Sequence, residues 1–421
     1  MDLAGHERVL RMHGRRVNSH THSMEETPTV EEERTPTTLR ALGNGYYSDD
    51  ATKRYSEREI AEVNERERET NANAMERVRR EGFVRYPLFT WNVFGEPIEA
   101  EAWVHPSFEP SASVGFEERY GMKFNIYIPS YERAGSAGTM KVLDEFGVGN
   151  YYVCIDASQF EAYAKVYPVE RLVVRDLRFR DPDMLNAASG AAHPITMAGH
   201  APLCNFTLAL SRSMGETHFW FHDDDIRKMA VKAVKREHAK EIKKYDARKF
   251  HRVSHLKQSH GFDLRAFMAE IEDVAVRVRN PGFVGLEKFG MTFTDPVRAK
   301  RGTRVFTYYL TSVETQIAHY GRQNNDIVTS LELEKHGLVN LLFKGVAYDS
   351  EPTQGGGGQT DMYERWGTLD KTRVAVRAHP SRVTVMEKNS RIHHDTDFRG
   401  LPKRVVGKPV GGENELRFKN A

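Results

Sequence analysis

The chain has 421 residues and carries 61 lysines and arginines against 59 aspartates and glutamates, a net charge of +2. This length suits one large catalytic domain with a polar extension, and the balanced charge excludes binding to nucleic acid through the overall field, so any such binding needs a local basic patch. The two cysteines, Cys154 and Cys204, lie in apolar stretches and are too few for a secreted disulfide scaffold.

The N-terminus lacks the apolar stretch of a signal peptide, and no later run reaches the roughly 18 apolar residues of a membrane span, so we expect a cytoplasmic protein with no membrane partner. Residues 1–82 predict a charged extension, partly disordered or helical, because their apolar positions are too sparse for a core. Within it, residues 55–82 mix Glu and Arg at helical spacings, which favours a solvated helix over a binding site. Residues 83–121 form an aromatic connecting segment that is expected to pack on the main domain.

Short apolar runs alternate with helical patterns from residue 122 onwards. Such alternation predicts βαβ units and an α/β fold with a mostly parallel sheet flanked by helices. We assign this domain to residues 122–390 and a polar tail to residues 391–421. The first predicted strands and helices, in chain order, cover residues 122–129, 138–147, 151–156, 158–167 and 171–176.

A helix over residues 203–215, with Pro202 suited to its start, precedes a strand that runs into three consecutive aspartates, Asp223, Asp224 and Asp225. Ligands of open α/β sheets bind outside the carboxyl ends of strands, so chemistry is expected here. Three adjacent carboxylates repel one another unless a cation neutralises them, and their oxygens suit Mn²⁺ or Mg²⁺. The alternative is an acidic first turn of a helix that starts near Ile226.

This order of features resembles the nucleotide-sugar domain of GT-A (Rossmann-like) glycosyltransferases. It consists of PSYERAG after the first strand, an acid ending the second strand, a helix that carries an asparagine, and an apolar strand into DDD. The resemblance implies a metal at Asp225 and Asp223, and a nucleotide-sugar donor, expected to be a UDP-sugar. The residues that it implies for donor binding are Pro129, Tyr131, Arg133, Asp156, Asn205, Asp223 and Asp224. In this family the acid in the position of Asp156 accepts a hydrogen bond from uracil. Alternatively, Asp156 caps the following helix and Arg133 is a solvated loop charge.

A second motif, GRQNNDIVTSLELEKHG, opens a helix with Asp326. It resembles the helix beneath the acceptor in inverting GT-A enzymes, although Asn325 stands where that family usually has Glu. Inverting transfer needs one carboxylate to accept the proton of the acceptor hydroxyl, and Asp326 is the candidate base, with helix capping as the alternative. His379 is a weaker candidate for a third metal ligand, since a lone histidine is more often structural.

Residues 227–257 form a basic insert, with twelve Lys or Arg and only three acids. This density predicts contacts with the phosphates of DNA, and the alternative is a solvated helical insert. The candidate DNA contacts are Lys235, Arg236, Lys243 and Lys244. Gly356 and Gly357 lie in a run of four glycines that predicts a mobile acceptor loop, or alternatively a flexible linker.

Together, IPSYERA, HDDDIRKM, NNDIVTSLELEKHG and the glycine run resemble the TET-associated glycosyltransferases of bacteriophages. This resemblance implies a hexosyltransferase, expected to be inverting, that acts in the host cytoplasm on DNA containing 5-hydroxymethylpyrimidines. The base must leave the duplex, or be single-stranded, to reach the donor. A glycan, lipid or protein acceptor is an alternative, and so is a metal-dependent nucleotidyltransferase or nuclease, because clustered aspartates also serve phosphoryl chemistry. A pure DNA-binding module would leave the acids at the strand end without a purpose.

Overall fold

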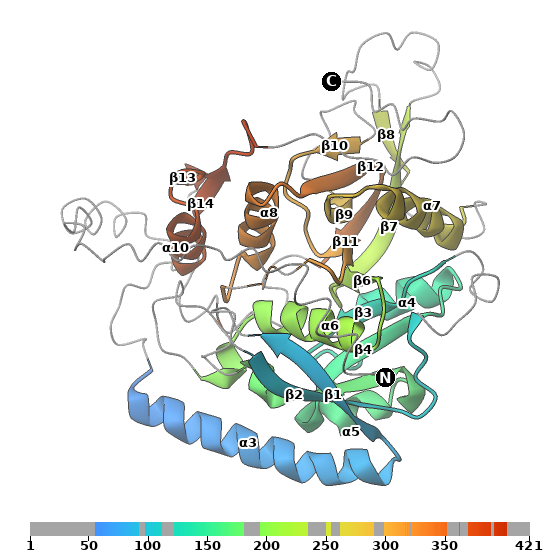
Figure 1. Cartoon of the computed structure of the whole chain (residues 1–421), viewed down its shortest axis with the longest axis vertical. Helices are drawn as coiled ribbons and strands as arrows, with labels where there is room; N and C mark the ends of the chain where they lie inside the picture. Colours follow the sequence, from blue (N-terminus) through green and yellow to red (C-terminus); the bar gives the residue numbers. More distant parts are fainter. Residues whose placement is uncertain are drawn as a thin grey trace, which may run out of the picture. The chain divides into compact units, whose positions relative to one another are not determined.

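The structure is a computed structural model (Figure 1), and all of its described residues belong to one compact unit, Asn44–Ala421. The residues that it describes are 55–91, 97–111, 122–180, 194–234, 250–253, 262–289, 299–315, 317, 319, 321–351, 362, 369–388 and 391–401. No helix in this part of the chain is long and apolar enough to cross a membrane.

Parallel strands form the centre of a 12-stranded sheet, as the sequence predicted. They lie in the order β5-β4-β3-β6, with bounds Leu172–Arg175, Tyr151–Asp156, Ile126–Pro129 and His218–His222. Their residues are almost continuously buried because both faces of the sheet are covered by helices, which is the usual reason that parallel strands are apolar throughout.

Further strands extend the sheet on both sides of this centre, and most of them pair antiparallel with their neighbours. Beside β5 lie β2 (Pro97–Val104) and then β1 (Val84–Trp91), so the connecting segment contributes a hairpin where the sequence predicted no strand. Beyond β6 follow β11 (Tyr308–Ser312), β9 (Pro281–Lys288), β12 (Val339–Ser350), β7 (Ile226–Val234) and β8 (Phe250–Val253), while β10 (Ala299–Arg301) pairs with β12. A separate small sheet pairs β13 (Val383–Lys388) with β14 (Arg391–Thr396).

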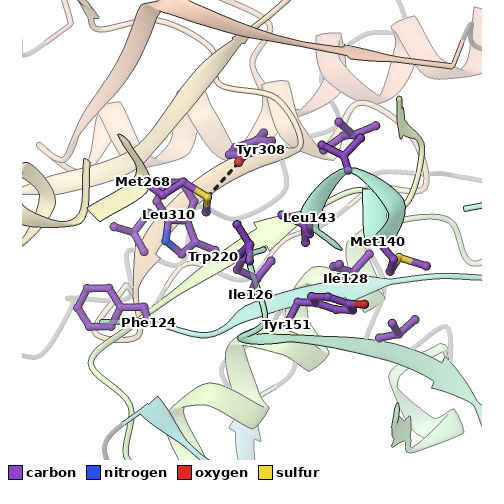
Figure 2. Close-up of a cluster of buried hydrophobic side chains, with 14 of the residues drawn as sticks. Phe124, Ile126, Ile128, Met140, Leu143, Tyr151, Trp220, Met268, Tyr308 and Leu310 are labelled. Atoms are coloured by element: carbon purple, nitrogen blue, oxygen red, sulfur yellow. Dashed lines mark hydrogen bonds between the residues drawn. The ribbon is translucent and has the colours of Figure 1, made fainter. Parts of the chain in front are cut away.

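Alternate residues of the central strands pack against different helices. On one face, Ile126 and Trp220 join side chains of α4 (Gly138–Glu145), α5 (Phe160–Ala164) and α7 (Leu264–Arg277). Figure 2 shows part of this cluster, where the hydroxyl of Tyr308 also contacts the sulfur of Met268. On the other face, Tyr127 packs with side chains of α6 (Ala201–Ser213). The period of two residues along each strand thus builds two apolar layers.

Two further helices lie toward the C-terminal part of the described chain. Buried side chains of α8 (Asn325–Lys335) pack with those of α10 (Leu369–Ala378) and with Val383 of β13 in a third cluster. Short 3₁₀ helices cover Ala157–Gln159, Val169–Arg171, Leu177–Arg180 and Ile195–Met197.

Helix α3 (Glu57–Arg80) confirms the predicted helix in the N-terminal extension, but it is docked rather than fully solvated. Its N-terminus has a capping box, in which the Ser56 side chain and Glu59 bond each other's backbone. Its buried residues, Asn64, Asn71 and Val78, recur every seven positions and so lie on one face. This narrow buried edge is too polar to be recognised as a core-facing stripe from sequence.

The predicted alternative of a helix starting near Ile226 is wrong. Residues Ile226–Val234 form strand β7, which pairs antiparallel with β12 and with β8. Aspartates before an apolar residue are a helix-start signal, but here they form the turn between two strands. The partner strand β12 lies over a hundred residues away in the chain, so its pairing is invisible to local patterns.

Candidate active site

The candidate site lies where the order of the strands reverses. The chain runs from β3 outwards to β4 and β5 and then returns to add β6 on the opposite side of β3. Ligands of open α/β sheets bind at such a switch point, because the segments after the two neighbouring strands diverge there. The segment after β3 carries Tyr131 and Arg133, and the segment after β6 is the aspartate triplet. The structure therefore brings two of the predicted donor segments together.

The backbone of the triplet is fastened to the first turn of α4. The N–H of Thr139 donates to the carbonyl of Asp224 at 3.3 Å, and its hydroxyl donates to the carbonyl of Asp223. The same hydroxyl accepts from the N–H of Ile226 at 3.0 Å. Gly138 approaches so closely that an added Cβ would lie 2.5 Å from the carbonyl oxygen of Ile226. These contacts fix the turn that presents the three carboxylates.

Asp224 points toward the segment after β3. Its carboxylate accepts hydrogen bonds from Ser130 Oγ at 2.5 Å and from Arg133 Nη1 at 2.6 Å. Glu132 in the same segment has a left-handed φ of 56°, a conformation that costs a non-glycine residue about 1–3 kcal/mol and that clusters at ligand sites. The segment that begins after Pro129 is thus held by the middle aspartate, and the guanidinium of Arg133 faces the triplet.

Asp225 has the least satisfied carboxylate of the three. Its Oδ1 is buried and has no hydrogen-bond partner among the described residues. Burial, together with the nearby charge of Asp223, raises the pKa of Asp225 to about 7. A buried, unpaired carboxylate oxygen beside a second acid is the environment that a divalent cation relieves. The carboxylates of Asp225 and Asp223 therefore fit Mn²⁺ or Mg²⁺.

Asp223 faces the residue before α6. His200 Nε2 lies 3.7 Å from its carboxylate, and His200 Nδ1 lies 3.5 Å from Sγ of Cys204. Burial acts to raise the pKa of Asp223, but His200 and the positive charges of Arg133 and Lys288 together lower it overall. Sequence reasoning missed His200, since its only signal is its place beside Pro202 at the start of the helix. Cys204 is a buried free thiol, in agreement with the interpretation of the sequence.

Two other predicted donor residues have protein partners. Asn205 donates through Nδ2 to the carbonyl of His319 at 2.8 Å and accepts from its N–H at 2.7 Å. Asp156 is fully buried and forms ion pairs with Arg175 and with Arg180, the latter at 2.8 Å. Burial acts to raise the pKa of Asp156, but the two guanidinium groups lower it overall. The predicted hydrogen bond from uracil to Asp156 stays a prediction. For that bond to form, the base would have to reach a carboxylate that is fully buried and paired with two arginines.

Asp326 lies in the first turn of α8. The N-cap of this helix is Asn324, which has a left-handed φ of 58°, so Asp326 itself does not cap the helix. The Asp326 carboxylate lies within electrostatic range of Arg304 and His394. Tyr348 lies within electrostatic range of Asp223, Asp225 and Asp326, which places the candidate base in the same neighbourhood as the triplet.

His379, the predicted third metal ligand, does not join this cluster. His379 is buried, and its Nε2 contacts the carbonyl of Val328 in α8 at 3.0 Å. No group of three or more His, Cys, Asp or Glu side chains that could by itself hold a metal exists among the described residues. The other predicted acceptor contacts lie outside the described residues, and they are Lys235, Arg236, Lys243, Lys244, Gly356 and Gly357.

A family model described as TET-Associated Glycosyltransferase matches residues 124–358, which is more than half of the chain. The chain belongs to this family. The match spans the central strands, the triplet and Asp326, so the TET-associated glycosyltransferase region coincides with the geometry described above. The chain is thus a glycosyltransferase with the expected α/β fold. Comparisons with curated proteins and with solved structures find no match.

Proposed function

We propose that this glycosyltransferase moves a hexose from a UDP-sugar to the hydroxyl of a 5-hydroxymethylpyrimidine in DNA, with inversion and with Mn²⁺ or Mg²⁺. The proposed metal and nucleotide-sugar donor are supported by one observation: Oδ1 of Asp225 is buried at the switch point of the sheet and has no hydrogen-bond partner among the described residues. The carboxylates of Asp225 and Asp223 would hold a cation there, and its positive charge would offset the charge of a departing diphosphate. The DNA acceptor rests on the family's link to hypermodified phage DNA and on the basic insert.

In this proposal the three aspartates of the triplet and Asp326 have different roles. Asp225 and Asp223 hold the cation, while Asp224 fixes the segment after β3 through Ser130 and Arg133. Asp326 accepts the proton of the acceptor hydroxyl as the oxygen attacks the anomeric carbon from the face opposite the diphosphate. Its place in the first turn of α8, in the same neighbourhood as Asp223 and Asp225, supports this role.

The direct test incubates the full chain with UDP-hexoses, Mn²⁺ and DNA that contains either plain or 5-hydroxymethylated pyrimidines. The nucleosides are then weighed after digestion. We expect a hexose-sized mass gain only on hydroxymethylated bases, and none in EDTA or with Asp225→Ala. Robust transfer to a glycan or protein with no gain on any hydroxymethylated base would reject the DNA acceptor. Equal activity in EDTA and in Mn²⁺ would reject the metal, and strand cleavage without use of the sugar donor would indicate a nuclease.

A further inference from the structure

Glu67 lies on the docked edge of helix α3, between two anchoring residues. The side-chain oxygen of Asn64 accepts from the N–H of Ile195 at 2.8 Å, and that of Asn71 accepts from the N–H of Ser158 at 3.3 Å. Positions three and four residues apart share a face of a helix, so Glu67 points in the same general direction as its two anchors. Ser158 comes just after β4, so this face looks toward the carboxyl end of the central strands.

The Glu67 carboxylate reaches a buried cluster without being paired there. Its Oε1 is buried and has no hydrogen-bond partner in the described part of the chain. Arg180, Asp156 and Glu132 lie within electrostatic range, and burial raises the pKa of Glu67. A buried acceptor that no protein donor satisfies is costly, and such groups in native proteins call for a ligand or water.

Arg180 presents the complementary donor in the same cluster. Its Nη2 pairs with Asp156 at 2.8 Å, whereas its Nη1 is buried with no hydrogen-bond partner among the described residues. Its guanidinium also lies 4.4 Å from the centre of the Tyr131 ring. Asp156 is buried between Arg175 and Arg180, and its ion pair with Arg180 fixes the position of that guanidinium group.

We infer that Glu67 and Arg180 recognise the imide edge of the donor's pyrimidine base, with Glu67 accepting from the ring N–H and Arg180 donating to the adjacent carbonyl. Asp156 is then a positioning residue that acts through Arg180. Tyr131, beside Arg180, begins the segment that Arg133 fastens to Asp224, so the base and diphosphate ends of the donor are linked. This inference rests on the proposed UDP-sugar donor. It assigns a donor contact to α3, which lies before the matched residues 124–358.

The test measures equilibrium binding of UDP, with Mn²⁺, to the full chain by calorimetry. Glu67→Gln is expected to weaken UDP binding about 10- to 100-fold, as for loss of a hydrogen bond to a charged acceptor. Glu69→Gln, an exposed position on the same helix, is the matched control and should bind UDP like the wild type. UDP methylated at N3 cannot donate from the ring, so it should bind the wild type as weakly as UDP binds Glu67→Gln.

The N3-methyl comparison needs no variant, so it stays informative if Glu67→Gln is unstable. Equal binding of UDP and N3-methyl-UDP to the wild type, or unchanged UDP binding by a folded Glu67→Gln, would overturn the inference and leave the proposed function standing. Wild-type protein that binds no UDP would instead remove the UDP-sugar donor, and this inference with it.

Discussion

The carboxyl group of Asp225 destabilises the folded chain when it is ionised without a cation. Because burial raises its pKa to about 7, the folded protein retains a proton that the unfolded chain has already lost between about pH 4 and 7. In metal-free protein the free energy of unfolding should therefore fall as pH rises through this window. Asp225→Asn removes the charge, so in EDTA at pH 8 it should unfold at a higher temperature than the wild type.

Thermal unfolding at pH 5 and pH 8, with EDTA or Mn²⁺, checks this expectation. At pH 5 Asp225 is itself largely protonated, so the two proteins should then behave alike in EDTA. Mn²⁺ at pH 8 should raise the unfolding temperature of the wild type only. An Asp225→Asn protein that is less stable than the wild type in EDTA at pH 8 would contradict the account of an unrelieved buried charge.

Asp326 tests the catalytic step separately from donor binding. Asp326→Asn should lower transfer roughly 10²- to 10⁴-fold, the usual contribution of general base catalysis, while UDP affinity stays nearly unchanged. Glu332→Gln, on the same helix but paired with Lys335 and His336, is the control and should retain activity. Full transfer by Asp326→Asn would require another base or a retaining mechanism.

At the scale of elements, the first turn of α4 holds the aspartate turn by direct backbone contact. Gly138→Ala would place a methyl group 2.5 Å from the carbonyl oxygen of Ile226, so one of the two segments must shift. We expect a loss of about 1–3 kcal/mol in the free energy of unfolding, typical of overpacking, together with weaker Mn²⁺-dependent UDP binding. Gly135→Ala is the control, because a Cβ added there would meet no described atom within 4 Å. Unchanged stability and binding in Gly138→Ala would show that the contact does not matter.

Elements built from local patterns were predictable, whereas those built from distant pairing were not. β4 has the bounds that its apolar run predicted, and α6 begins with the predicted proline near its N-terminus. β7 was missed because its pairing partner β12 is remote in sequence. β1 pairs locally with β2, but this hairpin joins the sheet only through the pairing of β2 with β5, which is remote in sequence.

The same limit applies to the site. Residue order located the triplet and Asp326, because acids at a strand end and in a helix start are local signals. The different orientations of Asp224 and Asp225 depend on Ser130 and Arg133, which come from another strand. The ion pair of Asp156 with Arg175 arises because these residues face each other across the parallel strands β4 and β5. A single sequence does not show such partners.

Across the whole described molecule, the proposed site follows one order from donor to acceptor. In this proposal Glu67 and Arg180 would contact the base, the triplet would hold the cation beside the diphosphate, and Asp326 would face the acceptor. The proposed donor contacts would therefore come from both α3 and the central sheet, while the candidate base comes from α8. This division predicts that donor hydrolysis and DNA binding can be separated by mutation.

The basic insert is the segment whose role this separation tests. The structure describes two parts of this insert, β7 and β8, which pair with each other. The four candidate contacts, Lys235, Arg236, Lys243 and Lys244, lie between these strands in sequence. If these cations contact DNA phosphates, changing all of them to Gln should weaken DNA binding and make it less salt-dependent. Each lost contact should remove about one unit from the slope of log affinity against log salt.

The matched control changes the exposed cations Arg58, Arg77, Arg80 and Lys165 to Gln, which alters net charge by the same amount elsewhere. DNA binding of both proteins is measured over a salt series, and donor hydrolysis is measured without DNA. Hydrolysis should survive in both, because the triplet and its supports are untouched, whereas a destabilised protein would lose both activities. The insert would be excluded as the DNA contact if its variant and the control had the same salt slope as the wild type, since a contacted phosphate releases its counterions wherever the protein neutralises it.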